Sequence, residues 1–118
     1  LLRMNENKEL FNAIIKGIKE VKGVDTLSLD FKNIDTAICG YFIICSGTSN
    51  THVDSIKNSI VHFVKKIIKE SPWNIESDKN SEWVLLDFSD IVVHVFQKKA
   101  RELYKLEEFW GDANINVH

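Results

Sequence analysis

The stretch Trp83-Val-Leu-Leu-Asp-Phe-Ser-Asp-Ile-Val-Val-His-Val-Phe96 shapes the fold of this chain. Two runs of apolar, largely β-branched and aromatic residues flank Ser89-Asp90, a pattern that predicts a β-hairpin with a two-residue loop. Residues that lie opposite one another across a hairpin share a face. One face is then wholly apolar and is predicted to be core. Its pairs are Phe88–Ile91, Leu86–Val93 and Val84–Val95.

The other face of the hairpin mixes large apolar groups with a carboxylate and an imidazole. Either a helix covers this face, or it is an exposed apolar patch with a polar rim, which is typical of a binding surface. Asp87 and His94 are diagonal neighbours here and could form a polar pair across the face. The pairs of this face are Asp87–Val92, Leu85–His94 and Trp83–Phe96.

Composition indicates an ordinary globular domain. The chain has 118 residues, 44% hydrophobic and 27% charged, which suits a single domain over residues 1–118 with one core. The net charge of −2 argues against a basic nucleic-acid-binding surface, so we expect no direct, specific nucleic-acid binding.

Cysteine usage and hydropathy indicate a cytoplasmic protein. Cys39 and Cys45 have no Cys-x-x-Cys spacing and are interpreted as buried free thiols of a reducing compartment. No apolar run approaches the roughly 18 residues of a membrane span. Residues 1–4 are too short for a signal peptide, so no membrane partner is expected.

Hydrophobic periodicity predicts eight elements in the order α-β-β-α-β-β-β-α. That order indicates an α+β fold, a two-layer sandwich of helices on one mixed β-sheet. Gly23 is the predicted C-cap of the first helix, Ser49 or Asn50 the N-cap of the second, and Thr51 with Asp54 fits a capping box. In order, we expect a frayed lead-in (1–7), a helix (7–22), a half-buried strand (25–30), a buried central strand (41–46), a helix ending at Ser71-Pro72, a short strand (73–77), the hairpin, a short helix (98–103) and a tail (113–118).

Catalytic constellations are weak. The junction Ser46–Asn50 between a strand and a helix could hold an anion, but it lacks the Lys of a P-loop and the Asp-x-Asp of a two-metal site, so a capped helix start is favoured. A hydrolase set of Ser46 or Ser49 with His94 and Asp87 lacks the Gly-x-Ser-x-Gly elbow. The four histidines are scattered, without metal-ligand spacing. We expect no enzyme, metal or cofactor.

Three motifs together resemble the ribosome-silencing factor family, also called Iojap-like. They are Tyr41-Phe-Ile-Ile-Cys-Ser-Gly-Thr-Ser49 followed by His52-Val53, the hairpin Trp83–Phe96, and Arg101-Glu-Leu-Tyr-Lys-Leu-Glu-Glu-Phe-Trp110. The resemblance covers nearly the whole chain. It departs from the family at residues 75–82, where many relatives have Glu-Gly before the tryptophan.

The resemblance implies a nucleotidyltransferase-like topology without that activity. It implies a ribosomal silencing factor that binds the large ribosomal subunit through its protein number fourteen, blocks subunit joining and represses translation when nutrients are short. Organellar relatives act in ribosome assembly. Carried over onto this sequence, the partner-binding residues are Trp83, Asp87, Phe88, Asp90, Val92, His94, Phe96, Tyr104 and Trp110.

Two alternatives remain open from the residues. One is a nucleotide-binding or nucleotidyltransferase-like enzyme using Ser46–Asn50. The other is a plain homodimerisation module, because an exposed β-face or edge can pair with a second copy. If the hypothesis drawn from the family resemblance is right, we expect Trp83→Ala to abolish large-subunit binding without unfolding the domain.

Overall fold

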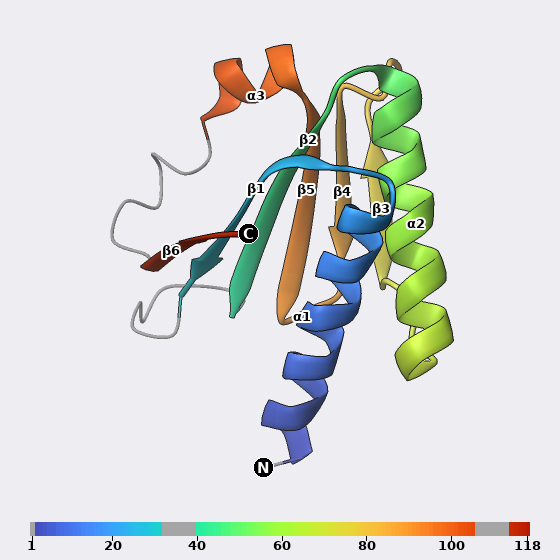
Figure 1. Cartoon of the computed structure of the whole chain (residues 1–118), viewed down its shortest axis with the longest axis vertical. Helices are drawn as coiled ribbons and strands as arrows, with labels where there is room; N and C mark the ends of the chain where they lie inside the picture. Colours follow the sequence, from blue (N-terminus) through green and yellow to red (C-terminus); the bar gives the residue numbers. More distant parts are fainter. Residues whose placement is uncertain (1, 32–39, 106–113) are drawn as a thin grey trace.

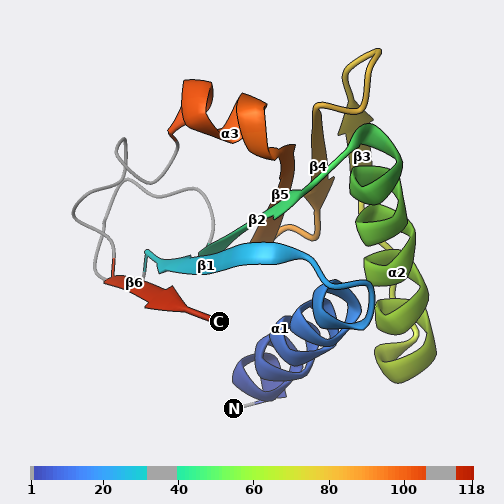
Figure 2. The ribbon, with the colours of Figure 1, turned by 45° about the horizontal axis from the view of Figure 1, so that its top comes forward.

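One six-stranded mixed sheet organises the protein, with two long helices on one face and a short helix at the end of the other (Figures 1 and 2). The structure is a computed structural model that describes residues 2–31, 40–105 and 114–118. The α+β class is confirmed. The elements are α1 (Leu2–Glu20), β1 (Val24–Asp30), β2 (Tyr41–Gly47), α2 (Asn50–Ile68), β3 (Asn74–Ser77), β4 (Trp83–Asp87), β5 (Ile91–Gln97), α3 (Lys98–Tyr104) and β6 (Asn114–Val117).

The strand order is β3-β4-β5-β2-β1-β6, and β2–β5 is its parallel pair. The predicted hairpin register is confirmed, with Trp83 opposite Phe96 and Leu85 opposite His94. The amide of Phe88 donates to the carbonyl of Ile91 at 2.9 Å, which closes a two-residue loop. Ser89 adopts a positive φ of 76° to make that turn.

The main core lies between the sheet and the helices α1 and α2. The predicted apolar face of the hairpin belongs to it: Val84, Leu86 and Ile91 are fully buried there. β2 is the predicted central strand, and its residues from Ile43 to Gly47 are buried. Burial raises the pKa of the Cys45 thiol to about 12, partly offset by Arg101, so this cysteine is an inert core thiol.

α1 begins earlier and ends differently than the pattern predicts. The expected lead-in is helical from Leu2. The left-handed residue at the helix end is Lys22, with φ 58°, and not Gly23. The amide of Gly23 donates to the carbonyl of Ile18 and that of Lys22 to Lys19, which together form a Schellman motif. Gly23 is needed because a Cβ there would lie 2.5 Å from the Ile18 side chain.

α2 is capped by Ser49, one of the two predicted residues. Its hydroxyl accepts the amide of His52 at 3.1 Å. The predicted Thr51–Asp54 capping box is wrong, because Thr51 lies inside the helix and the Asp54 carboxylate accepts the hydroxyl of Ser81. The helix ends at Ile68 with Lys69 in the left-handed region, before the proline is reached.

The predicted C-terminal tail is wrong for residues 114–117, which form strand β6. β6 pairs antiparallel with β1, placing Asn116 opposite Ser28 and Ile115 opposite Leu29. Its four residues are exposed, so an inward-facing apolar stripe does not mark it in the sequence. The interpretation of Cys39 concerns a residue outside the described ranges.

Candidate partner-binding face

The second face of the sheet, opposite α1 and α2, carries five of the residues that the sequence singled out: Trp83, Asp87, Val92, His94 and Phe96. We call it the α3 face. α3 covers only one end of it: Ala100 packs in a small cluster with Phe96 and Ile44. Further along β4 and β5, Leu85, Asp87 and Val92 remain half-buried. The face is therefore partly covered and partly open. This outcome lies between the two alternatives that the sequence allowed, a face covered by a helix and an exposed apolar patch.

An aromatic cluster underlies this face. The Trp83 ring stacks on Phe96 at 5.3 Å with an interplanar angle of 16°. His94 lies beside it, 5.9 Å from Trp83 and 4.6 Å from Phe42 between ring centroids. Phe31 meets Phe42 edge-on at 4.9 Å. Strands β4, β5 and β2 bring these rings together because their registers align alternate residues on one face.

His94 is held as a neutral imidazole. The indole Nε1–H of Trp83 donates to its Nδ1 at 3.2 Å, so the proton of the neutral ring is on Nε2. Burial lowers the pKa of His94 from 6.5 to about 4. Nε2 has no hydrogen-bond partner within the part of the chain that the structure describes.

The polar pair between Asp87 and His94 that the sequence allowed does not form. The Asp87 carboxylate turns to the hairpin loop and accepts the amide of Ser89 at 2.8 Å. This local side-chain hydrogen bond stabilises the turn, in which Ser89 has a positive φ. His94 takes the Trp83 indole in place of the carboxylate.

The predicted site residues separate into surface and interior. Trp83, Asp87, Asp90 and Val92 are half-buried. His94 and Phe96 are 4% and 1% exposed and support the face from beneath. Phe88 is 6% exposed and packs on the α1 and α2 side, as its place on the hairpin predicts. The side chain of Tyr104, at the end of α3, and all of Trp110 lie outside the description.

A groove beside Trp83 adds residues that the predicted site did not include. Its volume is about 230 Å³. Strand pairing places Glu76 opposite Leu85 at one wall. Asp78 accepts the amides of Glu82 and Trp83 at its other end, which fixes the loop before β4. Alternate residues of a strand point to opposite faces, and this alternation in β3 could have placed Glu76 on the α3 face. The groove is lined by Glu76, Ser77, Asp78, Trp83 and Leu85.

The junction between β2 and α2 is structured by its own side chains. The amide of Thr48 donates to Nδ1 of His52 at 2.9 Å, and Nε2 of that ring bonds the carbonyl of Val21 at 2.7 Å. With Ser49 capping the helix, the capped start fits better than an anion site. Ser46 accepts from Arg101 at 3.0 Å and His94 from Trp83, so the hydrolase set is not assembled.

Comparison with known proteins decides the family. The family model described as "Ribosomal silencing factor during starvation" matches residues 4–118. The chain belongs to the ribosomal silencing factor family. It is 36% identical over 110 residues to the ribosomal silencing factor of Halalkalibacterium halodurans, covering 91% of this chain and 90% of that protein.

Two further proteins are similar to this chain. A solved structure from Chromobacterium violaceum superposes with a TM-score of 0.80 at 31% identity, covering 88% of this chain and 85% of that one. A mouse protein named for mitochondrial assembly of the ribosomal large subunit is 33% identical over 72 residues, covering 59% of this chain and 32% of its own length. None of the helices in the described ranges of our chain is long and apolar enough to span a membrane.

Proposed function

We propose that this protein binds the large ribosomal subunit through the α3 face, with ribosomal protein number fourteen as its contact, and sterically blocks subunit joining. The observation that carries the proposal is the half-exposed apolar surface of Trp83, Leu85 and Val92 over the aromatic cluster. Apolar anchors in a polar rim are the usual centre of a protein interface. We further propose that the repression acts in the cytoplasm under nutrient limitation.

Charge supports a basic partner. Glu76 and Asp78 line the groove next to Trp83, and Asp87 lies on the same face. A carboxylate rim complements a partner surface that carries exposed lysine and arginine side chains. This mechanism requires no catalytic turnover. The apolar centre supplies the binding energy, and the volume of the bound domain blocks subunit joining.

Trp83 is a poor first test, because its indole is hydrogen-bonded to His94 and stacked on Phe96. Val92 is better. It is half-buried on the α3 face and lies directly opposite Asp87, which can accommodate a cation without unfolding the sheet. We expect Val92→Lys to weaken large-subunit binding about tenfold or more, since it places a charge in the apolar centre facing a basic partner. Co-sedimentation with separated subunits measures this.

Val61→Lys is the matched control. Val61 is also half-buried, but it lies on α2 and packs against the core on the opposite side of the sheet. We expect the control variant to bind the large subunit as the wild type does and to leave fewer joined ribosomes when added to mixed subunits. Equal affinity of both variants, or wild-type binding to the small subunit, would overturn the assignment of the α3 face.

A further inference from the structure

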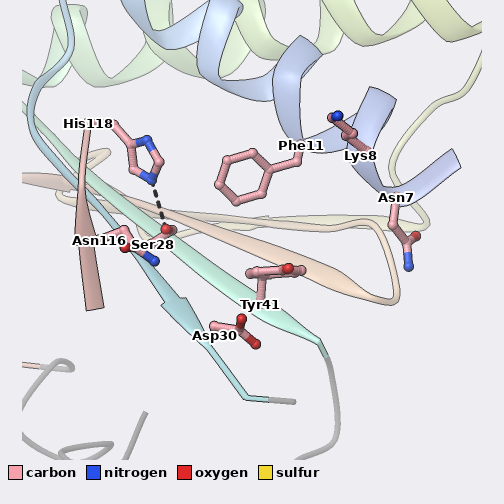
Figure 3. Close-up of a pocket in the computed structure, with 8 residues that line it drawn as sticks. All are labelled: Asn7, Lys8, Phe11, Ser28, Asp30, Tyr41, Asn116 and His118. Atoms are coloured by element: carbon pink, nitrogen blue, oxygen red, sulfur yellow. Dashed lines mark hydrogen bonds between the residues drawn. The ribbon is translucent and has the colours of Figure 1, made fainter. Parts of the chain in front are cut away.

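A pocket of about 400 Å³ opens on the other side of the sheet, where α1 passes over β1, β2 and β6 (Figure 3). Its volume falls within the range of small-molecule sites. It lies near Tyr41, at the start of β2, whereas the Ser46–Asn50 junction is at the end of that strand. The pocket is lined by Asn7, Lys8, Phe11, Ser28, Asp30, Tyr41, Asn116 and His118.

Aromatic rings form its apolar part. Phe11 projects from α1 into the centre of the pocket in Figure 3. Its ring meets Tyr41 edge-on at 5.3 Å and the His118 imidazole edge-on at 5.4 Å. Offset and edge-to-face arrangements of this kind extend readily to a further flat ring. The pocket therefore favours a planar aromatic group.

The polar groups around these rings are of opposite kinds. Asp30 offers only acceptors and Lys8 only donors, whereas the amide of Asn116 offers both. Ser28 Oγ and His118 Nε2 are 2.7 Å apart, and burial together with the Lys19 ammonium lowers the pKa of His118. A complementary ligand carries hydrogen-bond donors and acceptors on the edge of its ring.

Other ligand classes fit less well. A hydrocarbon would make no hydrogen bond with the Asp30 carboxylate or the Asn116 amide, and covering polar groups with an apolar ligand costs free energy. A small inorganic anion would fill little of the volume and would meet the Asp30 carboxylate. A metal ion lacks ligands here, since no cluster of three or more His, Cys, Asp or Glu side chains occurs in the described part of the chain.

We propose that this pocket binds a nucleoside, with its base packed on Phe11 and Tyr41 and the polar edge of the base on Asp30 and Asn116. Nucleobases combine a flat ring with N–H donors and carbonyl or ring-nitrogen acceptors, which is the mixture that the walls present. The ligand bridges α1 and β6. Among the strands that the structure describes, β6 pairs with β1 alone, so a bound nucleoside also holds this edge strand in place.

The test is an NMR titration of the ¹⁵N-labelled full chain with adenosine, guanosine, cytidine and uridine in turn. We expect at least one to shift the amides of the pocket residues with saturation at submillimolar to millimolar concentration. The same nucleoside should slow the amide exchange of Ile115 and Val117 in β6. If none of the four shifts those amides at millimolar concentration, the proposal is wrong.

Asn116→Leu and Asn114→Leu form a matched pair of variants. Both residues lie on β6, two positions apart and so on the same face of the strand, but only Asn116 lines the pocket. Loss of the amide should weaken nucleoside binding about tenfold in Asn116→Leu and leave Asn114→Leu unchanged. Equal affinities would overturn the site, and the titration of the wild type remains decisive if Asn116→Leu fails to fold.

Discussion

The pKa of His94 links the aromatic cluster of the α3 face to the pH dependence of stability. His94 accepts the Trp83 indole and is 4% exposed, and its pKa falls to about 4 in the folded chain. An unfolded histidine titrates near 6.5. Between those values the unfolded chain takes up a proton that the folded chain refuses. Stability from this group is therefore full above about pH 6.5 and falls as the pH drops towards 4.

We expect acidification across that window to lower the free energy of unfolding by up to about 3 kcal/mol through His94. In His94→Gln the amide oxygen still accepts the Trp83 indole, but nothing titrates. Urea denaturation at several pH values should show a shallower loss of stability in this variant than in the wild type. His62→Gln, at an exposed position on α2, is the control. Parallel profiles for wild type and His94→Gln would contradict the burial of a neutral ring.

At the scale of elements, Gly17 shows how packing overrides helix propensity. Glycine inside α1 costs about 1 kcal/mol relative to alanine. The structure gives the reason for it: a Cβ at Gly17 would lie 2.9 Å from Cα of Ile60, at the crossing of α1 and α2. The hydroxyl of Ser59 also donates to the Gly17 carbonyl at 2.6 Å, which holds the two helices close.

Gly17→Ala is therefore expected to destabilise the protein by about 1–3 kcal/mol, because α2 must move away from α1. Propensity alone predicts the opposite sign. Asn12→Ala, at an exposed position of the same helix, should change stability little or raise it slightly. Urea denaturation of both variants measures the difference, and a more stable Gly17→Ala would show that the helices do not approach this closely.

At the scale of the whole molecule, Arg101 joins α3 to strands β1 and β2 of the sheet. Its Nη1 donates to the carbonyl of Asp25, at the start of β1, and to the hydroxyl of Ser46, near the end of β2, at 3.0 Å. Asp25 is itself unusual, with φ 51° beside a register shift in β1. One side chain thus joins α3 to two strands that lie far before it in the sequence.

Arg101→Met keeps the aliphatic stem and removes both bonds. We expect it to lower the free energy of unfolding by about 1–2 kcal/mol and to speed amide exchange in α3. Lys99→Met, on the exposed side of α3, should do neither. Hydrogen exchange followed by mass spectrometry distinguishes them. Unchanged exchange in α3 of Arg101→Met would mean that packing of Ala100 alone holds the helix.

Local pattern was sufficient for most of the framework. Period-two alternation gave the hairpin register from Val84 to Val95, and the spacing of apolar residues gave α1 and α2. These signals are strong because each element buries one continuous face. For the candidate site, pattern placed Trp83, His94 and Phe96 on one face but did not show that the last two are buried.

The sequence by itself determined the class of the fold, the hairpin and its register, and, through its motifs, the family. Only the tertiary structure decided that residues 114–117 form a strand, because an exposed edge strand is stabilised by the backbone of β1 and not by its own side chains. It also decided the partner of His94 and the existence of the pocket. Both depend on contacts between residues far apart in the sequence, such as Phe11 on α1 and Asn116 on β6 in the pocket. A local sequence pattern does not contain this information.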